Sequence, residues 1–172
     1  LNNFGPLPAI GNLGGIAGVY KTPAIHAEIT GVFTNSAPTS PYRGAGRPEA
    51  TLAIEQVIDL ASRELGIDRI ELRRRNIISP DSMPYQTALS YKYDCGEFER
   101  NMDRALEMAE ASDFEQRRAQ SKSAGKLRGL GVANAVEQAA GMFDEGGEIR
   151  FDQEGHITVL MGTHAHGQGH ET

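Results

Sequence analysis

The chain has 172 residues, of which 39% are apolar and 23% charged, which is enough to build a folded domain around a buried core. Its formal net charge of −6 argues against nucleic-acid binding, because a nucleic-acid surface needs an excess of positive charge. The single Cys95 excludes an internal disulfide, and no apolar run approaches the roughly 18 residues of a membrane span, so we expect a cytoplasmic protein that does not bind membranes.

The first third of the chain predicts a loop, a strand and a long helix. Glycine, proline and asparagine dominate residues 1–18, which is typical of a loop leading into structure. Residues 24–34 alternate in polarity and contain several β-branched side chains, which predicts a strand. A helix is expected from Pro48 until Gly66, with its apolar face buried. The residues that recur on that face at helical spacing are Ala50, Ile54, Val57, Ile58, Ala61 and Leu65.

Three shorter helices are expected in the middle of the chain. Asp68 is a suitable cap for a helix that ends near Asn76, and its three arginines at 73–75 predict a solvated or ion-paired helix face. An apolar stripe at helical spacing predicts a further helix over 97–111, and residues 115–123 continue it after a break. We interpret the stripe as core packing.

The last third changes from helical to alternating patterns. Residues 127–136, 148–151 and 156–161 predict three strands, with a turn at 152–155 between the last two. The complete set of elements indicates an α+β fold in which helices pack on a small, largely antiparallel sheet. The chain shows no internal repeat and no low-complexity linker, so we predict one unit.

A glycine-rich segment, PYRGAGRPEA at residues 41–50, leads directly into the helix that begins at Pro48. A helix N-terminus carries unpaired N–H groups and a partial positive charge. Arg43 and Arg47 lie on either side of Gly44 and Gly46, so the loop is suited to a phosphate or another anionic group. Glycine-rich loops before helices are common, and the segment alone is weak evidence for a binding site.

A second glycine-rich segment, GTHAHGQGHET, occupies residues 162–172. The carboxamide of Gln168, between Gly167 and Gly169, offers both a donor and an acceptor to the edge of a heterocycle such as a pterin. His164, His166 and His170 also lie here, and imidazole binds transition metals. The histidines lack the spacing and the full ligand set of a zinc site, so no metal ligand is assigned.

The two segments together make the chain resemble the large, molybdenum-binding subunits of the molybdenum hydroxylases, the family of xanthine dehydrogenase, aldehyde oxidase and aerobic carbon monoxide dehydrogenase. Further landmarks of the family are GVYKTPA at 18–24, ELRRRN at 71–76, Pro84-Tyr85 and YDCG at 93–96. The resemblance covers essentially the whole chain. Within the family, the chain looks like the carbon monoxide dehydrogenase-type large chains.

The resemblance implies that residues 1–172 are a fragment of the molybdenum-cofactor-binding domain and that the cofactor is molybdenum–molybdopterin cytosine dinucleotide. In the family the dithiolene of the pterin holds the metal, so no protein ligand to the metal is expected. The implied reaction is hydroxylation of a small-molecule substrate, with electrons leaving through iron–sulphur and FAD partners in an oligomeric complex. The residues implied to contact the cofactor are Arg43, Gly44 and Ala45 near the molybdenum and Gly167, Gln168 and Gly169 at the pterin.

Departures from the family pattern bear on the substrate. Carbon monoxide dehydrogenases carry a copper-binding cysteine directly after the arginine of the first motif, whereas this chain has Gly44, so carbon monoxide is not the expected substrate. Purine and aldehyde enzymes often have a phenylalanine where Ala45 stands, and its absence leaves the pocket more open. The catalytic glutamate of the family is expected beyond Thr172. We therefore assign no catalytic residue here, neither Glu137 nor Glu171.

Three hypotheses follow. According to the first, the chain is part of a molybdenum hydroxylase large subunit. We expect this fragment to be inactive in isolation, because half of the cofactor cleft is missing. The second is a cofactor-free scaffold or interaction domain with the same fold. The third is a small histidine-based metal protein.

Overall fold

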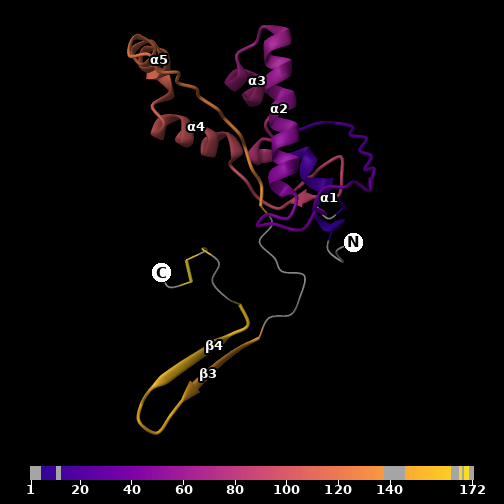
Figure 1. Ribbon diagram of the computed structural model, residues 1–172, viewed down its shortest axis with the longest axis vertical. Helices are drawn as coiled ribbons and strands as arrows, with labels where there is room; N and C mark the ends of the chain where they lie inside the picture. Colours follow the sequence, from indigo (N-terminus) through magenta and orange to yellow (C-terminus); the bar gives the residue numbers. More distant parts are fainter. Residues whose placement is uncertain (1–4, 11–12, 138–145, 164–166, 168, 171–172) are drawn as a thin grey trace. The chain divides into compact units, whose positions relative to one another are not determined.

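The computed structural model describes residues 5–10, 13–137, 146–163, 167 and 169–170 (Figure 1). The chain divides into two compact units, Leu1–Glu137 and Gln138–Thr172. The assignment of both units to one cofactor-binding domain stays a prediction. Within the described residues, no helix is both long enough and apolar enough to span a bilayer.

The first unit is mainly helical and the second is a hairpin, so the α+β class is confirmed. The helices of the first unit are α1 (Leu7–Ile10), α2 (Arg47–Leu65), α3 (Arg69–Asn76), α4 (Phe98–Met108) and α5 (Phe114–Ser123). Short 3-10 turns lie at Leu13–Ala17 (η1), Pro80–Ser82 (η2) and Ala111–Asp113 (η3). Strands β1 (Tyr85–Gln86) and β2 (Lys92–Tyr93) form a small antiparallel pair, as do β3 (Gly147–Phe151) and β4 (Ile157–Met161) in the second unit.

Helix α2 confirms the predicted long helix, but the expectation about its buried face is partly wrong. Val57 and Leu65, both expected to be buried, are 59% and 63% exposed. Glu55 and Ser62 are buried instead, because α2 packs against α3 through polar contacts. The Ser62 hydroxyl donates to the Ile67 carbonyl over 2.6 Å, and Glu55 accepts from an α3 arginine, as described below. Burial on this helix therefore follows hydrogen-bond partners and not hydropathy alone.

Helix α3 begins at the predicted cap. The Asp68 carboxylate accepts the N–H groups of Ile70 and Glu71 over 2.8 and 3.1 Å, which satisfies two of the unpaired donors at the helix start. The chain then returns to the segment before α2, where Tyr20 and Ile77 form an antiparallel bridge. Helix α3 is thereby fixed at both ends.

The hydrophobic core of the first unit is small and lies where residues 19–20, α2, α3 with the residue after it, α4 and residues 132–136 meet. Its buried members are Val19, Tyr20, Ile77 and Met102, with Ile54, Ile58, Ile70, Phe98, Leu106, Val132 and Val136 packed around them. The Phe98 and Leu106 contacts confirm that the apolar stripe of α4 is core packing. Next to the core, burial raises the pKa of Tyr93 to about 12, and its hydroxyl donates to the Gly18 carbonyl.

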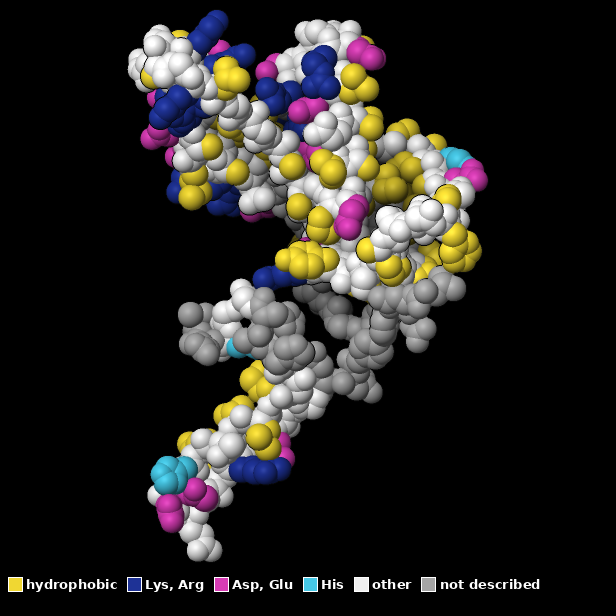
Figure 2. All heavy atoms as spheres, viewed as in Figure 1, with side chains coloured by type: hydrophobic (Ala, Val, Ile, Leu, Met, Phe, Trp, Pro, Cys, Tyr) yellow, Lys and Arg dark blue, Asp and Glu magenta, His cyan; other side chains and the backbone are white. Residues whose placement is uncertain are grey.

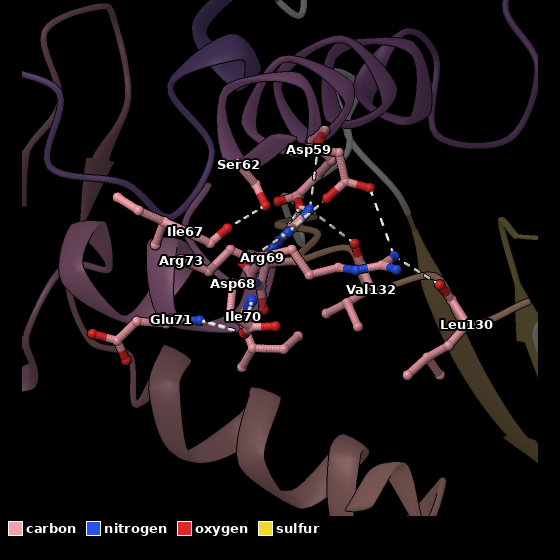
Figure 3. Close-up of polar contacts among 12 residues, drawn as sticks. Asp59, Ser62, Ile67, Asp68, Arg69, Ile70, Glu71, Arg73, Leu130 and Val132 are labelled. Atoms are coloured by element: carbon pink, nitrogen blue, oxygen red, sulfur yellow. Dashed lines mark hydrogen bonds and ion pairs between the residues drawn. The ribbon is translucent and has the colours of Figure 1, made fainter. Parts of the chain in front are cut away.

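Two predicted strands are absent from the described residues. Residues 24–34 form no strand, and Val32 and Phe33 are 73% and 84% exposed, because no other segment of the described chain pairs with them. Residues 127–136 also form no strand. The backbone carbonyls of Leu130 and Val132 accept hydrogen bonds from arginine side chains of α3 in place of a neighbouring strand (Figure 3).

The second unit confirms the predicted hairpin and its turn. Ile149 pairs with Val159, and Phe151 pairs with Ile157, so these side chains share one face with Met161. All five are exposed, and Figure 2 shows apolar side chains along the hairpin. The opposite face carries the Glu148–Arg150 ion pair of 2.7 Å. The expected packing of helices on this sheet stays a prediction.

Candidate cofactor-binding segments

The first candidate segment is a tight turn at residues 42–46, which we call the glycine turn. Gly44, Ala45 and Gly46 all have positive φ, at 94°, 46° and 100°. Backbone N–H groups of Ala45 and Arg47 close the turn by donating to the carbonyls of Tyr42 and Gly44 over 2.5 and 3.0 Å. Three successive left-handed residues are unusual, because this region is costly for a residue with a Cβ atom such as Ala45.

Neighbouring protein atoms explain why two of these positions are glycine. A Cβ atom on Gly44 would lie 2.7 Å from ring carbons of Pro48. A Cβ atom on Gly46 would overlap the backbone carbonyl of Pro8 in α1. The turn is therefore packed between α1 and the first residues of α2, and larger side chains are excluded from it.

The electrostatic setting of the glycine turn suits an anionic ligand. Gly46 caps α2 without a side-chain hydrogen bond, and a proline lies in the first turn of this 19-residue helix, so no side chain of the cap covers the positive helix end. Arg43 is exposed beside the turn, while Arg47 is partly buried. An exposed guanidinium group beside the positive end of a helix is chemistry that binds phosphate, so Arg43 and the start of α2 fit a phosphate-bearing dinucleotide cofactor.

Glu137 also reaches the glycine turn. Its carboxylate forms an ion pair with Arg47, with 2.7 Å between Glu137 Oε1 and Arg47 Nη1. The same nitrogen donates a hydrogen bond to the Gly44 carbonyl oxygen over 3.4 Å. Sequence reasoning did not foresee this contact, since 90 residues separate the partners and no local pattern connects them.

The second candidate segment follows β4. Gly167 and Gly169 have positive φ, 93° and 82°, on either side of position 168. Thr163 Oγ1 lies 3.2 Å from His170 Nε2, which brings the two sides of the loop together. Gln168 itself lies outside the described residues, as do His164 and His166. Gly167 and Gly169 therefore adopt a backbone conformation that residues with a Cβ atom rarely adopt, and the expected approach of this backbone to a cofactor stays a prediction.

The predicted site residues lie in two separate groups, one in each candidate segment. Arg43, Gly44 and Ala45 share one turn of the first unit, and Gly167 and Gly169 share one loop of the second. The histidine-based metal hypothesis gains no support from the described residues. There the only group with metal-ligating geometry is Asp152, Glu154 and His156, which are exposed in the β3–β4 turn.

Farther along α2, a buried ionic network that sequence reasoning missed joins this helix to α3. Arg73 is fully buried and donates to Glu55 over 2.9 Å and to Asp59 over 2.8 Å. Burial alone would lower its pKa, but the bonds to the two carboxylates outweigh this and raise it. The predicted ion-paired face is confirmed for the exposed Arg75, which pairs with Glu71, whereas Arg73 points into the protein.

The network extends to the extended segment at residues 130–137, which we call the strap. Arg69 and Arg73 donate to the carbonyls of Leu130 and Val132 over 2.8 and 3.1 Å (Figure 3). The side chain of Asn134, which is also buried, donates to the Tyr20 hydroxyl, and that hydroxyl donates to Glu55 over 2.6 Å. The strap is therefore held along its length before it reaches Glu137.

Cys95 has no place in either candidate segment. Its side chain is exposed, shortly before α4, and the neighbouring Asp94 raises the pKa of its thiol. A raised pKa opposes thiolate formation, which gives no support to a reactive or metal-binding role.

Comparison with known proteins places both segments in family-specific regions. Two models described as molybdopterin cofactor-binding domain match residues 2–77 and residues 105–172. The first match contains the glycine turn, and the second contains the strap and the loop after β4.

Several relatives are similar over nearly the whole chain. The 6-hydroxypseudooxynicotine dehydrogenase complex subunit gamma of Paenarthrobacter nicotinovorans is 34% identical over 97% of this chain and 22% of its own length. The carbon monoxide dehydrogenase large chain of Hydrogenophaga pseudoflava is 32% identical over 91% of this chain and 21% of its own. The crystal structure of quinoline 2-oxidoreductase from Pseudomonas putida 86 matches 91% of this chain and 22% of that chain, with a TM-score of 0.71 and 31% identity.

The chain thus spans about a fifth of the length of these relatives. Its sequence matches cofactor-binding regions at both ends, and its fold matches a solved member across nearly all of its residues. The chain therefore belongs to the molybdopterin cofactor-binding family of molybdenum hydroxylase large subunits.

Proposed function

We propose that the chain forms part of the large subunit of a molybdenum-dependent hydroxylase, in which both glycine-rich segments contact a molybdenum–molybdopterin cytosine dinucleotide cofactor. The observation that carries the proposal is the glycine turn, which sets the exposed Arg43 beside the positive end of α2, where the cap makes no side-chain hydrogen bond, within a molybdopterin-binding family region. Similarity to carbon monoxide dehydrogenase large chains supports the cytosine dinucleotide form of the cofactor.

Each segment has a distinct role in this proposal. Arg43 and the positive end of α2 attract an anionic part of the cofactor, and Gly44 and Ala45 add no large side chain beside it. Gly167 and Gly169 let the backbone approach the pterin closely, and the Gln168 carboxamide forms hydrogen bonds with the edge of the pterin. When bound, the cofactor supplies two-electron hydroxylation chemistry, in which water provides the oxygen atom and the electrons pass to redox partners.

The proposed substrate is a nitrogen heteroaromatic compound with an electrophilic ring carbon. Relatives named for nicotine, 6-hydroxypseudooxynicotine and quinoline support this class. Carbon monoxide is disfavoured, because the copper-binding cysteine of that reaction would fall at position 44. There φ is 94°, and a Cβ atom would lie 2.7 Å from the Pro48 ring.

The proposed partners are iron–sulphur and FAD subunits or domains, in an oligomeric complex located in the cytoplasm. One relative carries the name of a complex subunit, which supports a multisubunit assembly. A single cysteine in the chain supports a location where disulfides are not needed.

The test is the molybdenum and pterin content of the complete large subunit, produced together with its redox partners under adequate cofactor supply. Stoichiometric molybdenum is expected. Gln168→Ala should weaken cofactor retention by about 1–3 kcal/mol, because a buried heterocycle loses its hydrogen bonds. Gln153→Ala in the exposed β3–β4 turn is the matched control and should retain full molybdenum.

A complete subunit without molybdenum would overturn the proposal and favour the scaffold alternative. Unchanged molybdenum content in Gln168→Ala would overturn only the role of that carboxamide. The 172-residue chain by itself should hold no stoichiometric molybdenum and should hydroxylate nothing, because a large cofactor must be enclosed from several sides to exclude water.

A further inference from the structure

Arg47 connects the strap to the glycine turn through one guanidinium nitrogen. Its Nη1 atom lies 2.7 Å from Glu137 Oε1 and 3.4 Å from the Gly44 carbonyl oxygen. The Arg47 side chain is 19% exposed and the Glu137 side chain is 60% exposed, so this contact lies at the edge of the packed unit. The carboxylate thus fixes the position of the group that donates to the turn.

The Glu137 carboxylate also lies directly against the turn. A Cβ atom built on Gly44 would lie 3.8 Å from Glu137 Oε2, so the carboxylate borders the space that a side chain at position 44 would enter. Glu137 belongs by sequence to the second family region and Arg47 to the first. The ion pair therefore joins the two molybdopterin-binding regions inside one compact unit.

The hydrogen bonds of the strap fix the position of Glu137. Arg69, Arg73 and Tyr20 hold its residues 130, 132 and 134 over 2.8, 3.1 and 3.2 Å. Because those anchors belong to α3 and to the core, Glu137 lies at the end of a segment whose course is already fixed. Because the backbone before Glu137 is already ordered, its side chain loses little further conformational entropy when it pairs with Arg47.

We propose that Glu137 is a positioning residue: through Arg47 it keeps the glycine turn in the left-handed conformation that faces the cofactor. The inference rests on the proposed function for the identity of the ligand but not for the contact itself. The turn needs such support, because Ala45 has a φ of 46° and no glycine relieves the strain at that position. Glu137 takes no part in the reaction and acts only through the turn.

The test is amide hydrogen exchange, resolved by residue with NMR, on the 172-residue chain without cofactor. In Glu137→Ala the amides of Ala45 and Arg47, which close the turn, should exchange about tenfold faster or more, while amides in the middle of α2 keep their rates. Glu137→Gln retains an acceptor oxygen for Arg47 and should restore part of the protection. Glu64→Gln, an exposed carboxylate near the other end of α2, is the matched control and should change nothing.

Two outcomes of the exchange measurement would overturn the positioning role. Equal exchange at Ala45 and Arg47 in the Glu137→Ala and native chains would show that the ion pair does not hold the turn. Faster exchange along all of α2 would show a general structural role. Because the measurement needs no cofactor, its failure is distinct from a lack of molybdenum in the complete subunit. In that subunit, Glu137→Ala should also lower the molybdenum content, with unchanged content counting against the role.

Discussion

The two units of this chain hold their residues in place by different means. In the first, Arg73, Glu55 and Tyr20 form a buried polar network beside a small apolar core. In the hairpin, every residue of β3 and β4 is exposed, so the strands depend on the backbone ladder and the turn. The contrast teaches that side-chain contacts between distant segments stabilise the first unit, whereas short-range contacts form the second.

The largest effect should come from Arg73→Met. The substitution leaves the Glu55 carboxylate buried without its cation, which costs about 3–5 kcal/mol of unfolding free energy. Urea unfolding followed by far-UV circular dichroism measures the loss, and hairpin amides should keep their exchange rates. Arg75→Met, which removes the exposed ion pair with Glu71, should cost about 1 kcal/mol or less. Equal costs for the two variants would contradict the importance of burial.

Gly46→Ala should also have a large effect. The new methyl group would meet the Pro8 carbonyl and would stand at a φ of 100°, so overlap and strain add to about 2–4 kcal/mol. The matched variant in the hairpin is Gly155→Ala, where φ is 88° but no atom lies within 4 Å, so only strain of about 1 kcal/mol is expected. Thermal unfolding of both variants checks this, and a larger loss at Gly155 would refute it.

Tyr20→Phe should change both the stability and its pH dependence. Burial and the hydrogen bond to Glu55 raise the pKa of the Tyr20 hydroxyl above its ordinary value of 10.0, so the folded state favours the neutral phenol. This contribution is complete below about pH 10 and is lost as the pH rises above it. The variant should lose about 1–3 kcal/mol at neutral pH and show a flatter alkaline decline. Denaturation between pH 7 and 11 tests the slope, and an unchanged slope would exclude Tyr20 as its source.

The smallest effect on stability should come from the apolar face of the hairpin. Phe151 is 74% exposed, so Phe151→Ser should change the unfolding free energy of the first unit by less than about 0.5 kcal/mol. It should instead reduce binding of a fluorescent apolar dye and self-association, because exposed apolar faces promote both. Met102→Ala, at a fully buried site, is the contrasting variant and should cost about 2–5 kcal/mol. Sedimentation and dye fluorescence measure the self-association and dye binding of Phe151→Ser, and an unfolding curve measures the stability of Met102→Ala.

The sequence predicted the elements whose causes lie within a few residues. The Asp68 cap, the helical spacing before Gly66 and the turn at 152–155 all produced the expected structure, because each depends on local backbone hydrogen bonds. The glycines of both family motifs carry positive φ values, which fits close backbone turns, whereas their contact with the cofactor stays a prediction.

Only the tertiary structure decided which polar groups are buried and what the extended segments contact. An arginine run looks the same in sequence whether its side chains meet solvent or carboxylates, so the burial of Arg73 depended on Glu55 and Asp59 one helix away. The strap alternates like a strand, yet its Leu130 and Val132 carbonyls accept from arginine side chains of α3, and no strand of the described residues pairs with it. The Arg47–Glu137 pair has the same physical origin, since a contact across 90 residues is set by the packing of the whole unit and leaves no local pattern in the chain.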